Sequence, residues 1–132
     1  MSRFLLDTCA VLWLANGEAI DAEARSAIAA GERHVSPITA WEIANLARKN
    51  RIALTMPVSA WLQRAFGAMG ATLQELSVSI LVESCALAGI PPDDPADRII
   101  IATARQHDLT VVTRDAAILR YAQAGHARSM RC

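Results

Sequence analysis

The sequence predicts an α/β domain of three layers, in which a mostly parallel central sheet of about five strands is flanked by helices. Two observations support this fold class. Short apolar or β-branched runs alternate along the chain with longer segments of helical pattern, and such alternation is typical of parallel sheets that helices cover on both faces. In addition, Asp7 and Asp115 follow predicted strands, as expected for residues at the carboxyl edge of such a sheet, where ligands bind.

The first predicted elements are a strand, two helices and a second strand. Residues 3–7 form a short apolar run that ends abruptly at an acid, which is typical of a buried parallel strand. Residues 8–15 and 20–30 have the pattern of helices, and the first of these has an acid or a threonine as its N-cap. A short strand is expected at residues 34–36.

Proline marks the starts of the next two helices. Ser36 followed by Pro37 is the pattern of an N-cap and a first helical residue, and a second helix opens at Pro57. Residues 72–76 are expected to form a strand. Residues 77–88 are expected to form a helix, because a glycine and two prolines follow them.

The best-marked helix start in the chain is at Asp94. This acid stands at the N-cap, Pro95 at the first helical position and Asp97 at the third, and the helical pattern continues to residue 106. The remaining predicted elements are a strand at residues 109–113, a helix at 116–124 and a short last strand at 126–130.

Length and hydropathy indicate one soluble domain. A chain of 132 residues buries roughly two-thirds of the surface that it exposes when unfolded, so residues 1–132 are expected to form a single domain. The hydrophobic share of 53% is high, yet no apolar run approaches the roughly 18 residues that cross a bilayer. The N-terminal apolar run meets an acid too soon for a signal peptide. We therefore expect a cytoplasmic protein that has no membrane partner.

Charge and cysteine content exclude several other classes. Thirteen basic residues balance thirteen acidic ones, so the net charge is zero. Any polyanion would therefore have to bind to a local group of cations rather than be attracted by the overall charge. The cysteines are an odd set without the spacing of a zinc site or a disulfide framework, and we expect ordinary thiols: Cys9, Cys85 and Cys132. The tryptophans are all expected to pack, although Trp13 could also line a partner groove: Trp13, Trp41 and Trp61.

Four acids stand at positions where an α/β fold of this kind carries functional side chains: Asp7, Glu42, Asp97 and Asp115. Three of them also have a structural explanation, because Asp7 and Asp115 can cap helices and Asp97 can belong to a capping box. Glu42 is different, since it shares a helical stripe with apolar residues and has no cation four residues later. A half-buried carboxylate without a partner is costly. If Glu42 has a purely structural role, we expect it to form an ion pair with a distant arginine.

Together the four carboxylates suggest a site for a divalent metal. Carboxylates that meet without a cation between them repel and shift one another's pKa. Magnesium prefers hard oxygen ligands, keeps several waters and commonly takes only one or two carboxylates directly. One or two such metals could generate hydroxide from water and stabilise the charge that develops at a scissile phosphate. We therefore expect Mg²⁺ or Mn²⁺ as the cofactor.

Four motifs follow one another along the chain: Leu5-Leu6-Asp7-Thr8, Ser36-Pro37-Ile38-Thr39-Ala40-Trp41-Glu42-Ile43 with Arg48 and Lys49 behind it, Asp94-Pro95-Ala96-Asp97-Arg98-Ile99-Ile100-Ile101-Ala102, and Val112-Thr113-Arg114-Asp115. This ordered combination resembles PIN-domain ribonucleases and, within them, the VapC toxins of toxin–antitoxin pairs. The resemblance runs over the whole length and implies a PIN-like fold. It assigns the four acids to the catalytic metal site, with Thr8 and Thr113 as neighbours that orient water or carboxylate.

The resemblance also implies partners and a reaction. It implies a metal-dependent endoribonuclease that cleaves RNA, forms a homodimer and is inhibited by a cognate, VapB-like antitoxin. Asp94 is an extra acid, which we expect to act as an N-cap and as a supporting neighbour of the site. Weaker candidates for RNA contact are four cations: Arg48, Lys49, Arg51 and Arg98.

Other functions share parts of this pattern. A phosphatase of the haloacid dehalogenase type also starts with a strand that ends in Asp and also uses magnesium, but it needs a second acid where this chain has Cys9. A receiver or flavodoxin-like module would explain the fold, but a receiver needs a lysine near its last strand, and the only one here is Lys49. A PIN-domain nuclease of RNA processing and a catalytically silent RNA- or partner-binding domain are further alternatives.

Overall fold

The computed structural model describes residues 1–132 and contains one sheet of five strands, all of them parallel. The strand order is β3-β2-β1-β4-β5. The strands are β1 (Arg3–Leu6), β2 (Glu32–Val35), β3 (Thr72–Leu73), β4 (Thr110–Thr113) and β5 (Arg128–Arg131). The predicted fold class is confirmed, and the sheet is parallel throughout rather than mostly parallel.

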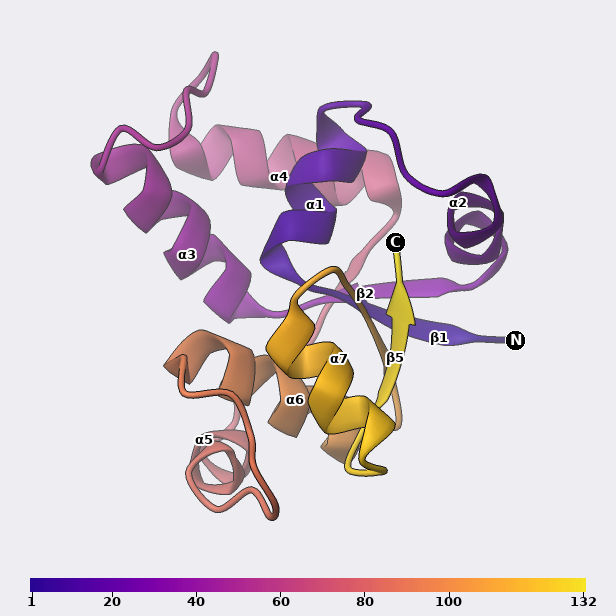
Figure 1. Ribbon diagram of the computed structural model, residues 1–132. Coiled ribbons are helices and arrows are strands. Elements are labelled where there is room, and N and C mark those ends of the chain that lie inside the picture. Colours follow the sequence, from indigo (N-terminus) through magenta and orange to yellow (C-terminus); the bar gives the residue numbers. More distant parts are fainter.

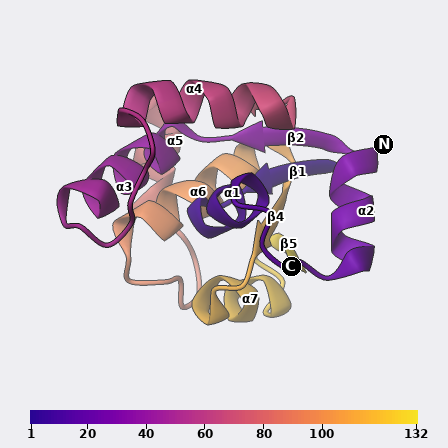
Figure 2. The ribbon, with the colours of Figure 1, turned by 90° about the horizontal axis from the view of Figure 1, so that it is seen from above.

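Seven helices lie around this sheet (Figure 1, Figure 2). They are α1 (Thr8–Ala15), α2 (Ala22–Ala30), α3 (Pro37–Arg48), α4 (Val58–Met69), α5 (Val78–Ser84), α6 (Pro95–His107) and α7 (Ala116–Gln123). Each begins within two residues of its predicted start, because caps and prolines mark these starts in the sequence. None of the helices has the length and apolarity that crossing a membrane requires.

Two predicted elements are shorter in the structure. The strand expected at residues 72–76 is only Thr72–Leu73, and the helix expected to reach residue 88 ends at Ser84. At that point the Ser84 hydroxyl donates back to the Leu81 carbonyl at 2.6 Å, and the Ser84 carbonyl accepts from Nε of Arg98 at 2.9 Å. A side chain from another helix therefore takes the carbonyl that a further helical turn would have used.

The hydrophobic core lies on both faces of the sheet. Along β1, Phe4 and Leu6 face a cluster built mainly with α1, α2 and α4, whereas Leu5 faces a second cluster built with α6 and α7. The same alternation occurs in β4, where Val112 belongs to the first cluster and Val111 to the second. Helices thus cover both faces, and the predicted three-layer arrangement is confirmed.

The topology reverses the chain order beside β1. This strand pairs with β2 on one side and with β4 on the other, so the chain order reverses between β1 and β4. In open α/β sheets, ligands bind at such a reversal, beyond the carboxyl ends of the strands. In Figure 2, α3 leaves the sheet on the side toward which β1 and β2 point. The residues that follow β1 and β4 are therefore the first candidates for function.

Candidate active site

Asp7 lies at the carboxyl end of β1 and is 6% exposed. One carboxylate oxygen accepts the Ala10 amide at 2.8 Å and so caps α1, as predicted. The other accepts the Thr113 hydroxyl at 2.6 Å. Burial raises the pKa of Asp7, and the charge of Asp115 raises it further, while these hydrogen bonds lower it. The carboxylate is therefore fixed in place and electrostatically crowded.

Thr113 connects Asp7 to the start of α7. Its hydroxyl donates to Asp7 and accepts the Asp115 amide at 2.9 Å, and its side chain is completely buried. Asp115 in turn caps α7, since its Oδ1 accepts the Ile118 amide at 2.9 Å, while the residue itself is exposed. One hydroxyl thus sets the positions of two segments that are far apart in the sequence.

Glu42 reaches the same region from α3. The Thr8 hydroxyl, at the first position of α1, donates to Oε1 of Glu42 and also lies 3.2 Å from the hydroxyl of Thr39. Burial raises the pKa of Glu42, the Thr8 hydrogen bond lowers it, and the charges of Asp94 and Asp7 raise it. No arginine or lysine pairs with Glu42, which excludes the structural alternative of a distant ion pair.

Asp97 is contributed by the first turn of α6. Asp94 caps this helix, as predicted, and accepts the Asp97 amide at 3.1 Å. The Asp97 carboxylate has no hydrogen-bond partner and no counter-cation within the protein. Burial, together with the charges of Asp115, Asp94, Glu42 and Asp7, raises its pKa from 3.8 to about 7. Such a shift is typical of functional carboxylates.

The charges of the four predicted acids act on one common thiol. Each contributes to the electrostatic shift of the Cys9 thiol, whose pKa burial raises to about 11 together with the charges of Asp7, Glu42, Asp97 and Asp115. None of the four acids forms an ion pair. The capping role of Asp115 leaves its second carboxylate oxygen without a partner, whereas both oxygens of Asp7 accept a hydrogen bond, from Ala10 and from Thr113. Capping is compatible with metal binding in both cases, because a carboxylate oxygen has more than one lone pair.

The acidic cluster has the chemistry of a divalent-metal site but not the spacing of a closed set of ligands. No three His, Cys, Asp or Glu side chains are placed to hold a metal ion together as they stand. A Mg²⁺ ion that keeps most of its waters requires only one or two direct carboxylates, and the hard oxygen donors of these acids suit such an ion.

The predicted RNA-contacting cations differ in their surroundings. The Arg98 guanidinium donates to the carbonyls of Ser84 at 2.9 Å and Pro92 at 3.2 Å, which ties α5 to the loop before α6. Arg48 donates to Asn45 Oδ1, and it is exposed, as are Lys49 and Arg51. Arg98 therefore anchors structure, whereas the other three cations are available at the surface.

One prediction about packing is wrong. Trp41 is 61% exposed, although it lies in a helix and was expected to pack. Trp13 and Trp61 are half-buried and pack against the first core cluster, as expected. Trp41 differs because the buried residues of α3, Thr39 and Ile43, lie about 160° from it around the helix axis, so Trp41 is on the opposite side of the helix.

Sequence reasoning missed two residues of the site. Cys9 lies within the field of all four acids, and its position two residues after Asp7 could have indicated this. Thr39 is completely buried beside Thr8, and its place one helical turn before Glu42 was the available signal. Both residues could have been found by asking which positions lie within one helical turn of a predicted acid.

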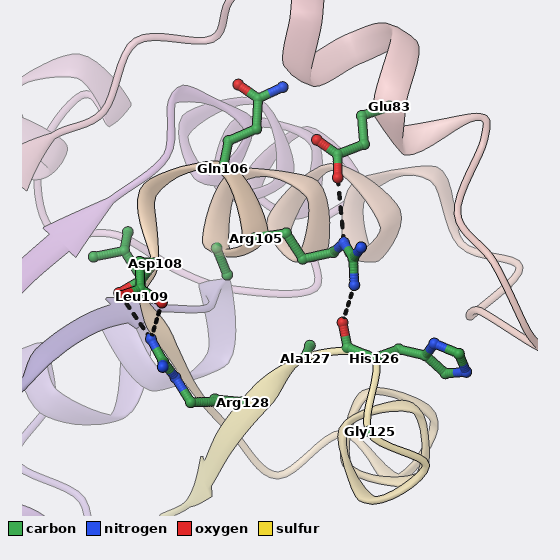
Figure 3. A pocket seen from close by; sticks show the side chains of 10 residues that line it. Glu83, Arg105, Gln106, Asp108, Leu109, Gly125, His126, Ala127 and Arg128 are labelled. Atoms are coloured by element: carbon green, nitrogen blue, oxygen red, sulfur yellow. Dashed lines mark hydrogen bonds and ion pairs between the residues drawn. The ribbon is translucent and has the colours of Figure 1, made fainter.

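A polar pocket at the opposite end of the strands is a poor alternative. Glu83, Arg105, His126 and Arg128 are among the residues that line it (Figure 3). Arg105 donates to Glu83 at 3.2 Å and to the His126 carbonyl, and Arg128 pairs with Asp108. The cations of this pocket are thus neutralised within the fold, unlike the carboxylates beside Asp7.

Comparisons with known proteins agree with this geometry. A family model of the PIN domain matches residues 4–124. Ribonuclease VapC22 of Mycobacterium tuberculosis is 38% identical over 117 residues, which cover 87% of this chain and 88% of that protein. Among solved structures, a toxin–antitoxin complex from Klebsiella pneumoniae is 28% identical, with a TM-score of 0.58 and coverage of 85% of this chain and 86% of that chain.

A more distant structure has the same fold. The VapBC2 complex of Rickettsia felis, bound to a DNA fragment from its promoter, aligns with a TM-score of 0.66 over 97% of both chains at 13% identity. The family model covers almost all of the secondary structure described above and includes all four acids. The chain therefore belongs to the PIN-domain family.

Proposed function

We propose that this protein is a metal-dependent endoribonuclease that hydrolyses RNA phosphodiester bonds, and that it is the toxic component of a VapBC-type toxin–antitoxin pair. The observation that carries the proposal is the set of four acids without counter-cations, gathered where the strand order reverses. The ribonuclease VapC22, to which the chain is similar, supports the reaction class. Membership of the PIN family favours this reading over a haloacid dehalogenase-like phosphatase.

The cofactor in this proposal is Mg²⁺ or Mn²⁺. The acids that would hold it are Asp7, Glu42, Asp97 and Asp115. When bound, such an ion supplies activated water and stabilises negative charge at the scissile phosphate. Thr113 and Thr8 hold the carboxylates of Asp7 and Glu42 by hydrogen bonds, and Asp94 adds negative charge beside Asp97. This arrangement keeps the oxygens oriented before any ligand arrives.

Protonation of Asp97 is part of the same proposal. With a pKa of about 7, its carboxyl holds a proton in neutral solution for part of the time and so reduces the repulsion within the acidic cluster. A divalent cation favours the ionised form of a carboxylate beside it. Metal binding should therefore release a proton from Asp97 and become tighter as the pH rises toward this pKa.

The proposed partners follow from the role as a toxin. A VapB-like antitoxin would hold the protein inactive, and the protein would act as a homodimer on RNA in the cytoplasm. The structural neighbour from Klebsiella pneumoniae is itself described as a toxin–antitoxin complex, which supports this part of the proposal.

The catalytic part is tested with Asp7→Asn and Glu42→Gln, assayed separately for RNA cleavage with Mg²⁺. Each should lose about 100-fold or more in rate, because metal-dependent charge stabilisation contributes several kcal/mol and each 1.36 kcal/mol is a factor of ten. Glu23→Gln, at an exposed acid of α2, is the matched control and should cleave normally. Unchanged cleavage by both site variants would remove Asp7 and Glu42 from the mechanism.

The toxin part is tested by induction in cells without an antitoxin. Expression of the wild-type chain should arrest growth, and Asp7→Asn should not, at equal protein levels. Harmless expression of a wild-type protein that cleaves RNA in vitro would favour the alternative of a PIN-domain nuclease of RNA processing. Sequencing of RNA ends after brief induction would then identify the cleaved RNA.

A further inference from the structure

We propose that the stripe of α3 formed by exposed Trp41, half-buried Asn45 and exposed Arg48, with exposed Lys49 at its end, binds single-stranded RNA beside the acidic cluster. In this arrangement, a nucleobase stacks on Trp41 and backbone phosphates contact Arg48 and Lys49. The inference rests on the proposed function and adds to it the surface that holds the substrate.

Trp41 is the first observation. It is the only tryptophan that is mostly exposed, at 61%, and it directly precedes Glu42 in α3. Exposed aromatic faces are the usual platforms on which bases of single strands stack, and this stacking tolerates any sequence because every base has a π-face. Trp41 thus places a stacking surface on the helix that also carries Glu42, about 100° around the axis from that carboxylate.

Helix geometry joins Trp41 to the cations. At 100° per residue, Asn45 and Arg48 lie within about 40° of Trp41 around the axis, and Arg48 is about 10.5 Å farther along it. The Arg48 guanidinium donates to Asn45 Oδ1 through Nε at 3.2 Å and Nη2 at 2.7 Å. This contact holds the cation along the stripe and leaves its other N–H groups free for a phosphate.

The charges of this stripe lack internal partners. Neither Arg48 nor Lys49 forms an ion pair, and both are exposed. Several other guanidinium groups are occupied: those of Arg3, Arg105 and Arg128 pair with acids, and those of Arg33, Arg98 and Arg114 donate to backbone carbonyls. Further exposed arginines also lack an ion pair, but none of them lies on the stripe that carries Trp41: Arg51, Arg64, Arg120 and Arg131. The end of α3 therefore presents positive charge that matches a polyanion.

The direction of α3 determines where a strand of RNA bound along the stripe would lie. The helix starts directly after β2, at the carboxyl edge of the sheet, and runs outward from the sheet (Figure 1, Figure 2). A strand of RNA whose scissile phosphate lies at the acids can thus extend along α3. Aromatic stacking followed by free cations suits a nucleic acid strand better than a second copy of this chain, which would have to cover cations that have no acids beside them.

The test is binding of a fluorescent, mixed-sequence single-stranded RNA without divalent metal, so that no cleavage occurs. Trp41→Leu should weaken binding by about 5- to 150-fold, since it keeps an apolar side chain but removes the π-face. Trp41→Phe should retain most of the affinity. Val82→Ala, at a 64% exposed apolar residue of α5, is the matched control and should bind like the wild type.

Two further measurements separate stacking from phosphate contact. Replacing the RNA by an abasic version should remove most of the difference between wild type and Trp41→Leu, because no base is left to stack. Arg48→Gln should lower the slope of log affinity against log salt by about 0.7, the value for one phosphate contact of a single strand. It should do so on both the normal and the abasic RNA.

The proposal is overturned if Trp41→Leu binds RNA like the wild type, or if it changes the oligomeric mass of the protein, which would place Trp41 between two copies. Either result is distinguishable from failure of the proposed function. In the first case the wild type would still cleave RNA with Mg²⁺. If the function itself is wrong, the wild type would neither cleave nor bind RNA, and Asp7→Asn would change nothing.

Discussion

At the scale of single residues, two hydroxyl groups form a short chain that ends on the Glu42 carboxylate. Thr8 bonds Glu42 and lies 3.2 Å from Thr39, which is completely buried. A hydroxyl has one proton, so when Thr8 donates to Glu42, Thr39 donates to Thr8. Thr39 is therefore a positioning residue that sets the direction of the Thr8 hydrogen bond without contact to substrate.

Removing the Thr39 hydroxyl tests this chain. Thr39→Val should lower kcat for RNA about 2- to 10-fold and leave KM unchanged, because one neutral hydrogen bond contributes roughly 0.5 to 1.5 kcal/mol. Thr39→Ser keeps the hydroxyl and should restore kcat. A serine variant as slow as the valine variant, with both equally destabilised, would mean that Thr39 contributes only packing.

The acids show how far single residues can be interpreted from the sequence. Helix caps made Asp7, Asp94 and Asp115 recognisable, and the structure confirms all three as caps. The sequence could not indicate that the second oxygen of Asp7 accepts the Thr113 hydroxyl, nor that Thr113 would join Asp7 to α7. Those facts depend on the pairing of β1 with β4, which local pattern does not contain.

At the scale of elements, Gly31 controls how closely α2 approaches β1. A Cβ at this position would lie 2.6 Å from the Phe4 ring and 2.7 Å from the Ser2 carbonyl oxygen. Because the carbonyl belongs to the backbone, it cannot move aside cheaply. The glycine is thus required by a close contact, and its φ of −97° is open to any residue.

Gly31→Ala should lower the free energy of unfolding by about 1 to 3 kcal/mol, the usual effect of overpacking. Gly67→Ala is the matched control, since Gly67 lies within α4 and a Cβ there meets nothing within 4 Å. That control should be neutral or stabilising by up to about 1 kcal/mol. Urea denaturation measures both, and an equal effect of the two substitutions would contradict the close contact.

Element starts could be predicted better than element ends. Ser36, Asp94 and Ser77 cap α3, α6 and α5 through side-chain hydrogen bonds within the first turn, so their local sequence was sufficient. The end of α5 could not be predicted, because it depends on Arg98 from another helix. The exposure of Trp41 likewise depends on the orientation of α3 against the sheet.

At the scale of the whole molecule, the parallel sheet brings four distant segments to one edge. The strand order reverses between β1 and β4, and α3 and α6 supply Glu42 and Asp97. Because burial and neighbouring charges raise the pKa of Asp7, Glu42 and Asp97, we expect the stability of the fold to depend on pH. Alternation of strands and helices predicted the layers, but the convergence of the acids required the topology.

Asp97 should make the metal-free fold less stable as the pH rises. Its pKa rises from 3.8 to about 7 on folding, so between these values the folded state binds more protons than the unfolded state. The stabilisation is complete below the lower value and is lost as the pH passes the upper one. Asp97→Asn should therefore show a weaker decline of Tm over this range in EDTA. Identical declines would contradict the raised pKa.

Binding of Mn²⁺, followed by the loss of its free-ion electron paramagnetic resonance signal, tests the central claim that the acids act as one cation site. We expect saturable binding by the wild type, weakened about tenfold or more by either Asp7→Asn or Asp97→Asn. Glu23→Gln should bind like the wild type. Absence of saturable binding, or equal affinity in all four proteins, would contradict a shared metal site built from these distant carboxylates.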